Sequence, residues 1–201
     1  MDKPAVIWAI VLAAGESRRM GTQKLLLPIE GATVVECVVN KAWQSGVSGV
    51  LAVLGADRSK VRRALRPLSV SFVVNKEFRR GMLSSIQAAF RVLPEDLQAA
   101  VVMLGDQPAI PASIIRDLIQ EYQANPKGIV VPVHGGRRGH PILIDGKFRP
   151  EILQLDPLVG LRQLLWSHPE AVREVAVDSP AILKDLDHPE DYAAEIRARS
   201  G

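Results

Sequence analysis

The protein has 201 residues, of which 47% are hydrophobic and 23% are charged, a composition typical of a soluble globular protein and unlike that of a disordered or fibrous chain. This length predicts a single domain over residues 1–201. A formal net charge of +3 favours anionic ligands. Because the chain has no dense lysine or arginine tract and only a few scattered aromatic residues, we expect no nucleic-acid partner.

Cysteine content and the length of the apolar runs bear on the cellular compartment. Cys37 is the only cysteine, which excludes an intramolecular disulfide and a cysteine-cluster metal site and suits a reducing cytoplasm. The apolar run over residues 5–14 is shorter than the ~20 residues that span a bilayer. Asp2 offsets Lys3 ahead of this run, so we expect no secretory leader. We therefore predict a cytoplasmic protein without a membrane partner.

Runs rich in valine, isoleucine and leucine predict strands, most of them buried on both faces. They cover residues 5–12, 49–54, 70–74, 99–104, 128–133 and 141–144. Segments with helical spacing separate the early runs, at residues 34–43, 57–68 and 82–93. Strands that alternate with helices predict right-handed crossovers and a mostly parallel central sheet with helices on both faces. The expected fold class is α/β.

The second half of the chain departs from this alternation. Pro111 is suited to the first turn of a helix, and Asn125–Pro126 predicts where that helix ends. Residues 130–144 resemble two strands around the turn at 135–139, a small β-hairpin excursion rather than another crossover. A helix at about residues 159–166, a strand at about 173–177 and a terminal helix from Glu190 complete the expected order.

Three segments at predicted strand ends carry chemically distinctive residues: 15–24, 75–85 and 105–108. Ligands of parallel α/β sheets gather beyond the carboxyl ends of strands, so we expect these segments to share one edge. The first segment combines small residues with Ser17, Arg18, Arg19 and Lys24, which suits a phosphate cradle. Its glycine spacing fits neither a dinucleotide fingerprint nor a Walker A loop. The alternative is a connecting loop with solvated basic residues.

The other two segments offer oxygen ligands and hydroxyl groups. Asp106 follows the apolar strand 99–104, where a carboxylate suits Mg²⁺ that takes its remaining ligands from phosphates. The alternative for Gly105–Asp106 is an ordinary turn. Ser84 and Ser85 open a predicted helix, where serine is also a common helix cap.

The first segment resembles the signature of the molybdenum-cofactor nucleotidyltransferases, in the form Leu-Ala-Ala-Gly-x-Ser-x-Arg-Met-Gly-x-x-Lys-Leu-Leu-Leu-Pro over residues 12–28. The resemblance implies a Rossmann-like nucleotidyltransferase fold in which this loop wraps the triphosphate. It assigns nucleotide contacts to Leu12, Ala13, Ala14, Gly15, Ser17, Arg18, Met20 and Gly21. Arg19 and Lys24 would have the catalytic task of neutralising charge as pyrophosphate leaves.

The same resemblance implies a metal site and a base preference. The family's Gly-Asp-x-Pro step and its Asp-x-Asp-Thr-Pro-Glu-Asp stretch place Mg²⁺ on Asp106, also counted as catalytic, and on Asp187. His188 stands where the family has threonine, which leaves a histidine-liganded transition metal as an alternative. Cytidine recognition is implied by Ala14 and by the second segment, through Asn75, Gly81, Met82, Ser84 and Ser85. The guanylyl branch has Leu-Ala-Gly-Gly and Gly-Pro-Leu-Ala-Gly at these places.

The acceptor side is expected to involve Gln107, Pro108, Gly139 and His140, since residues 137–141 resemble the family's Gly-Arg-x-Gly-His-Pro turn. An ordinary hydrogen-bonded histidine is the alternative for His140. The family's Gly-Asp-x-Gly-Ala-Arg landmark is poorly kept, because residues 155–162 read Leu-Asp-Pro-Leu-Val-Gly-Leu-Arg. This departure puts the identity of the acceptor in doubt more than the nucleotidyl-transfer reaction.

Together these features predict transfer of CMP from CTP to the terminal phosphate of molybdopterin, with Mg²⁺ as cofactor and pyrophosphate as product. A molybdoenzyme apoprotein or its chaperone would be the protein partner. Two alternatives stay open: a nucleotidyltransferase that uses GTP, a sugar phosphate or a phosphoalcohol, and a non-catalytic nucleotide-binding or cofactor-delivery protein.

Overall fold

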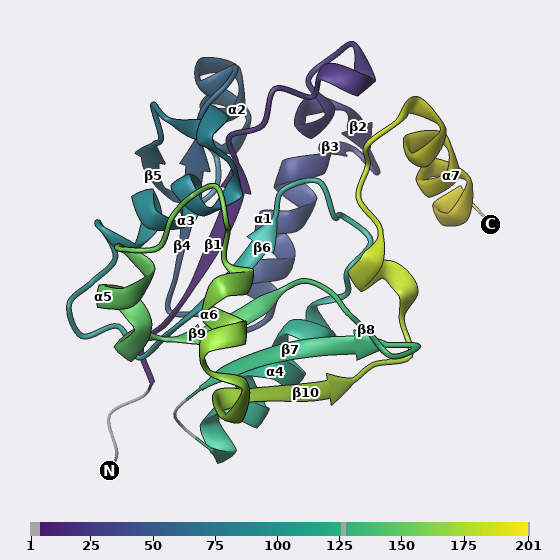
Figure 1. The fold of residues 1–201 in the computed structure, drawn as a ribbon. Helices are drawn as coiled ribbons and strands as arrows, with labels where there is room; N and C mark the ends of the chain where they lie inside the picture. The colour runs from purple at the N-terminus through teal and green to yellow at the C-terminus, as the bar shows by residue number, and fades with distance from the viewer. Residues whose placement is uncertain (1–4, 126–127, 201) are drawn as a thin grey trace.

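The computed structural model describes residues 5–125 and 128–200, and its centre is one twisted, mostly parallel sheet (Figure 1). Within these residues the strands follow the order β10, β7, β9, β6, β1, β4, β5, with β8 paired to the edge of β7. Their bounds are β1 Ile7–Ala13, β4 Gly49–Leu54, β5 Ser71–Val74, β6 Ala99–Leu104, β7 Ile129–His134, β8 Arg137–Arg138, β9 Ile142–Asp145 and β10 Val172–Ala176. The expected α/β class and mostly parallel central sheet are confirmed.

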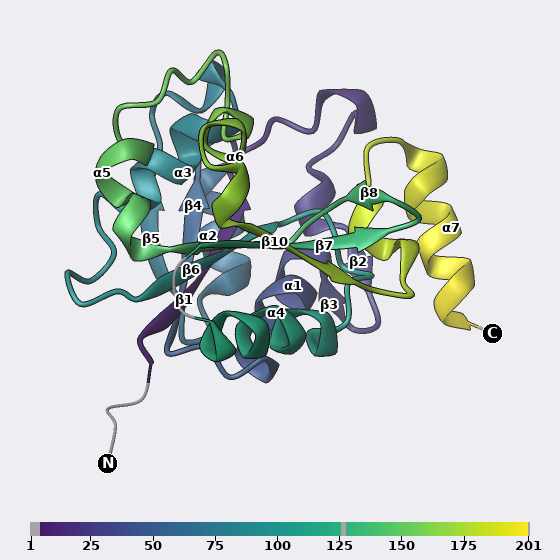
Figure 2. The same cartoon turned by 60° about the horizontal axis from the view of Figure 1, so that its bottom comes forward.

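Helices cover both faces of the sheet because alternate side chains of each central strand point to opposite faces. One face packs against α1 (Val34–Gln44), α2 (Arg58–Leu65) and α4 (Ala112–Ala124), and the other against α3 (Met82–Phe90), α5 (Arg149–Ile152) and α6 (Arg162–Ser167). Figure 2 shows α1 and α4 below the sheet and α3, α5 and α6 above it. The described residues contain no helix long and apolar enough to cross a membrane.

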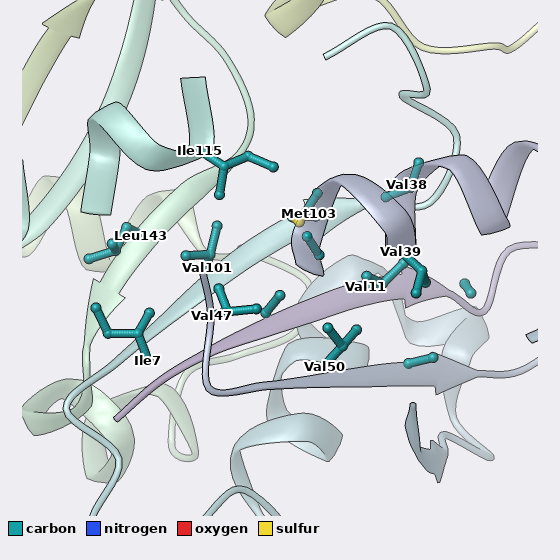
Figure 3. Close-up of a cluster of buried hydrophobic side chains, with 14 of the residues drawn as sticks. Ile7, Val11, Val38, Val39, Val47, Val50, Val101, Met103, Ile115 and Leu143 are labelled. Atoms are coloured by element: carbon teal, nitrogen blue, oxygen red, sulfur yellow. The ribbon is translucent and has the colours of Figure 1, made fainter. Parts of the chain in front are cut away.

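Strand β1 shows how the sequence produces this layering. Ala9 and Val11 belong to the core on the side of α1, while Ile10 belongs to the core on the side of α3. Figure 3 shows the first of these cores, in which Val38 of α1 and Ile115 of α4 lie over the strands. Burying each such side chain contributes roughly 1.5–3 kcal/mol, so the carboxyl end of β1 is held on a rigid base.

The hairpin region is more deeply integrated than expected. Strands β7 and β9 are antiparallel, as predicted, with Ile129 opposite Ile144. However, β9 also pairs antiparallel with β6, so it lies inside the central sheet and not as an excursion from it. Leu143 points into the core on the side of α1 and Ile144 into the core on the side of α3, which explains why residues 143–145 are nearly inaccessible.

Several element boundaries and short elements differ from the expectations. Helices α2 and α3 end three residues early, at Leu65 and Phe90, and α6 begins only after Gly160, whose positive φ of 86° interrupts a helix. The pair β2 (Pro28–Ile29) and β3 (Ala32–Thr33) and the helix α5 were not predicted, because such short elements lack periodicity. Helix α7 spans Pro189–Ser200, and Pro126 lies outside the described residues.

Candidate active site

The loop after β1 folds back on itself over the end of the sheet. Ser17 has a left-handed backbone (φ 51°, ψ 34°), residues 18–20 form a 3₁₀ turn, and Gly21 is again left-handed at φ 67°. The backbone N–H of Lys24 donates to Ser17 Oγ at 3.2 Å, which closes the loop. The loop is therefore closed and compact, and it carries the small residues and the cations on one continuous segment of the chain.

Four charged side chains meet beneath this loop. Lys24 Nζ lies 2.5 Å from Asp106 Oδ2 and 2.9 Å from Asp187 Oδ1, and Arg19 Nη2 lies 2.8 Å from Asp187 Oδ2. Lys24 and Asp106 are only 13% and 17% exposed, so water screens their pairing weakly. The structure brings together the cations and the two carboxylates that the sequence singled out, although 163 residues separate Lys24 from Asp187.

These contacts perturb the protonation of the lysine and of one carboxyl group. Burial tends to lower the pKa of Lys24, but the charges of Asp106 and Asp187 outweigh it and raise that pKa above its ordinary value. Burial tends to raise the pKa of Asp187, whereas its hydrogen bond to Lys24 and the nearby Arg19 lower that pKa below its ordinary value. Both groups are therefore charged at neutral pH.

Backbone contacts bring Asp187 to this place. The N–H of Leu186 donates to the carbonyl of Asp106 at 3.1 Å, which joins the chain before α7 to the loop after β6. The backbone N–H groups of Asp187 and His188 both donate to Asp191 Oδ2, at 3.0 and 2.7 Å. Carboxylate acceptance at a helix start is favourable, so the family-like stretch also serves as a cap for α7.

A cavity of about 650 Å³ opens between the loop after β1 and the chain before α7. Figure 1 shows these two segments at the same end of the sheet. The cavity wall contains most of the predicted nucleotide and metal residues: Leu12, Ala14, Gly15, Ser17, Arg18, Arg19, Lys24, Gly81, Met82, Ser85, Asp106 and Asp187. The three marked strand ends thus lie at one edge of the sheet, as parallel topology predicts.

Other predicted nucleotide residues support the wall without being part of it. Ala13, at the end of β1, and Met20, within the loop, are buried, and Gly21 lines a second cavity of about 470 Å³. Asn75 is 5% exposed and its Nδ2 donates to Ser84 Oγ and Ser85 Oγ at 2.8 and 3.0 Å. Asn75 and Ser84 therefore hold the start of α3, while Ser85 is the serine on the cavity wall.

The cavity wall also contains residues that the sequence reasoning did not single out: Glu16, Leu25, Phe78, Arg79, Leu104 and Asp185. Glu16 accepts from Arg79 at 2.8 Å and from Arg18 at 2.7 Å, so it ties the first loop to the chain before α3. Asp185 was part of the quoted Asp-x-Asp stretch, and its spacing of two from Asp187 was the available signal. Partial burial, and then the charge of Asp106, raise the pKa of Asp185.

The four candidate acceptor residues do not line this cavity. Gln107 Nε2 donates to Asp185 Oδ1 at 2.7 Å, and the carbonyl of Pro108 accepts from Arg199 Nη2 at 2.7 Å. The backbone N–H of His140 donates to the carbonyl of Ile182 at 3.0 Å, and a Cβ on Gly139 would collide with that same carbonyl. Gln107 and His140 therefore hold the 182–187 segment in place, while Pro108 contacts helix α7.

Asp106 and Asp187 fit a divalent cation such as Mg²⁺, because their carboxylate oxygens are hard ligands. The two carboxylates lie close enough together that both contact the ammonium group of Lys24. The described residues contain no group of three or more histidine, cysteine, aspartate or glutamate side chains arranged to hold a metal. His188 is exposed and joins no such group, so the histidine-liganded transition metal finds no support among these residues.

The amino-acid sequence is similar to those of known proteins over nearly its whole length. The chain is 27% identical to the molybdenum cofactor cytidylyltransferase of Escherichia coli K12 over 94% of each chain. It is 30% identical to the nicotine blue oxidoreductase of Paenarthrobacter nicotinovorans over 92% of this chain and 94% of that protein.

Among solved structures, Rv0371c from Mycobacterium tuberculosis H37Rv superposes with a TM-score of 0.86 at 32% identity, covering 98% of this chain and 100% of that one. Another structure of Rv0371c, described as a complex with manganese, has a TM-score of 0.81 at 29% identity and covers 96% and 100% of the two chains. The family model described as the MobA-like NTP transferase domain matches residues 9–172. The chain therefore belongs to the MobA-like NTP transferase family and is a nucleotidyltransferase.

Proposed function

We propose that this nucleotidyltransferase transfers CMP from CTP to the terminal phosphate of molybdopterin and releases pyrophosphate. The observation that carries the proposal is the convergence of Arg19, Lys24, Asp106 and Asp187 in one cavity below the first loop. A protein that only bound or delivered a nucleotide would not require two carboxylates beside the phosphate-binding cations.

Asp106 and Asp187 would hold the divalent cation, which we propose to be Mg²⁺. When bound, that ion neutralises phosphate oxygens and orients the triphosphate. Lys24 pairs with both carboxylates in this structure, so its ammonium is placed to turn to a phosphate oxygen when the nucleotide enters. Arg19 and Arg18 are largely exposed; Arg19 pairs with Asp187, and Arg18 pairs with Glu16 on the same cavity wall.

The reaction needs positioning and charge neutralisation rather than a general base. An oxygen of the acceptor's terminal phosphate, already ionised at neutral pH, forms a bond to the α-phosphorus of CTP. The bond from that phosphorus to the bridging oxygen breaks, and pyrophosphate leaves with the electron pair. Arg19 and Lys24 stabilise the charge that develops on the departing group.

Cytidine as the base is supported by Ala14 on the cavity wall and by the Gly81, Met82 and Ser85 side of the cavity. Both places match the cytidylyl form of the signature rather than the guanylyl form. The E. coli relative named molybdenum cofactor cytidylyltransferase covers 94% of the chain and supports the same base and acceptor.

The test is release of pyrophosphate by the purified protein with Mg²⁺, using CTP or GTP against molybdopterin, molybdenum-loaded molybdopterin, a sugar phosphate and a phosphoalcohol. We expect turnover with CTP and a molybdopterin acceptor. Preference for GTP, or turnover only with a sugar phosphate or phosphoalcohol, would overturn the substrate assignment. Binding of both substrates without pyrophosphate release would instead indicate a delivery protein.

A further inference from the structure

Gln23 lies within the first loop and has no role in the proposed reaction, yet its side chain is buried, with 9% exposure. It occupies one of the variable positions of the loop signature, between Gly21 and Lys24. It lines the second cavity and not the first. A long polar side chain buried at this place needs hydrogen-bond partners.

Both ends of the Gln23 amide bond to the loop itself. Ser17 Oγ donates to Gln23 Oε1 at 2.8 Å, and Gln23 Nε2 donates to the carbonyl of Gly15 at 3.3 Å. The amide also reaches Asp57 Oδ2, at 3.5 Å, where α2 begins. One side chain therefore joins the start of the loop to its end and joins the loop to the chain after β4.

Ser17 is the residue that most needs this support. A left-handed backbone with φ of 51° is disfavoured for any residue with a Cβ, so surrounding contacts must hold it. Ser17 Oγ donates to Gln23 while accepting from the backbone N–H of Lys24 at 3.2 Å. Gly15, Ser17 and Lys24, which all line the nucleotide cavity, thus depend on one amide behind them.

We propose that Gln23 is a positioning residue that pins the loop in the shape that receives the β- and γ-phosphates of the nucleotide, acting through Ser17, Gly15 and Lys24 and not by touching the nucleotide. This inference rests on the proposed binding of a nucleoside triphosphate at the first loop. It predicts that replacing Gln23 weakens the binding of nucleoside triphosphates and hardly changes the recognition of the base.

The test compares CTP and CMP binding by calorimetry, with Mg²⁺ present, in the wild type and in Gln23→Met, which keeps the length of the side chain but removes its hydrogen bonds. We expect the Kd for CTP to rise about tenfold, the size of one or two lost hydrogen bonds. CMP lacks the β- and γ-phosphates, so its Kd should change less than about twofold. The Kd for GTP, if measurable, should rise by the same factor as that for CTP.

Gln44→Met is the matched control, because Gln44 is exposed at the end of α1, and it should leave both affinities unchanged. Gln23→Asn, one methylene too short to span both partners, should reproduce the pattern if Gln23→Met does not fold. In a double-mutant cycle, Gln23→Met should have a smaller effect once Ser17→Ala has removed the shared hydroxyl, and the effect that is left should reflect the bond from Gln23 to the carbonyl of Gly15.

The outcomes separate this inference from the proposed function. Equal losses for CTP and CMP, unchanged CTP affinity, or additive effects in the cycle would overturn the role of Gln23. Failure of the wild-type protein to bind CTP would instead overturn the proposed function.

Discussion

The two sides of the cavity are built in different ways. On the nucleotide side, one continuous loop presents Gly15, Ser17, Arg19 and Lys24 to the cavity through their own backbone and side chains. On the other side, the candidate acceptor residues do not line the cavity: Gln107 bonds to the side chain of Asp185, and the backbone of His140 bonds to the carbonyl of Ile182. The first side presents side chains to the cavity, and the second is mostly scaffold for the segment that carries Asp185 and Asp187.

This difference predicts which substitutions should change ligand binding and which should change stability. Changes on the nucleotide side should alter ligand binding with little effect on folding, because the side chains end in the cavity. Changes on the acceptor side should act through displacement of the carboxylates, so stability and turnover should fall together. The following predictions test this contrast.

The largest effect is expected for Asp106→Asn, which removes one charge from the cluster around Lys24 while keeping the side chain's shape. We expect kcat/KM with CTP and Mg²⁺ to fall roughly 10²–10³-fold, because Asp106 would hold the Mg²⁺ that compensates the phosphate charge. Steady-state pyrophosphate release measures it. The exposed Asp117→Asn on α4 is the matched control and should keep wild-type turnover. Full activity in Asp106→Asn would contradict the assignment of this carboxylate.

Gly139→Ala tests the scaffold side. A Cβ at this position would collide with the carbonyl of Ile182, so the segment that carries Asp187 must shift. Overpacking of this kind costs about 1–3 kcal/mol in the free energy of unfolding, measured by denaturant titration. Turnover should fall while the Kd for CMP stays near the wild-type value. An equally stable variant with normal turnover would show that this contact does not position the carboxylates.

His140 makes the stability of the scaffold side depend on pH. Burial lowers the pKa of His140 below its ordinary value of 6.5, although the charge of Asp106 partly opposes this shift. As the pH falls below 6.5, the unfolded chain takes up a proton that the folded His140 resists, so the free energy of unfolding decreases. His140→Asn should flatten this slope between pH 6.5 and the lowered pKa. Identical slopes in His140→Asn and wild type would contradict burial of a neutral imidazole.

The smallest effect is expected at the mouth of the cavity. Glu16 accepts from both Arg18 and Arg79 and so competes with phosphate for them. Glu16→Gln should tighten CTP binding about two- to fivefold at low salt, and the gain should disappear at high salt because Arg18 and Arg79 are exposed. Glu77→Gln, which breaks the exposed pair with Arg80, is the control and should change nothing. Weaker CTP binding in Glu16→Gln would mean that Glu16 supports the loop instead of competing for its cations.

Sequence reasoning singled out the first loop because a local pattern contains it. The run from Leu12 to Lys24 is contiguous, and parallel topology brings Asp106 to the same edge. The acceptor side depends on contacts between distant segments, such as Gly139 with Ile182 and Leu186 with Asp106, that no local spacing predicts. For the same reason the insertion of β9 between β6 and β7 was not foreseen.

The central claim is transfer of a cytidylyl group, and the most direct measurement follows the α-phosphorus. The protein is incubated with Mg²⁺, molybdopterin and CTP labelled with ³²P at the α-position, and the products are separated by chromatography and weighed by mass spectrometry. We predict that the label appears in a molybdopterin cytidine dinucleotide, with one pyrophosphate released for each label transferred. Label that stays in CTP, or that leaves as free CMP without joining the acceptor, would contradict the account.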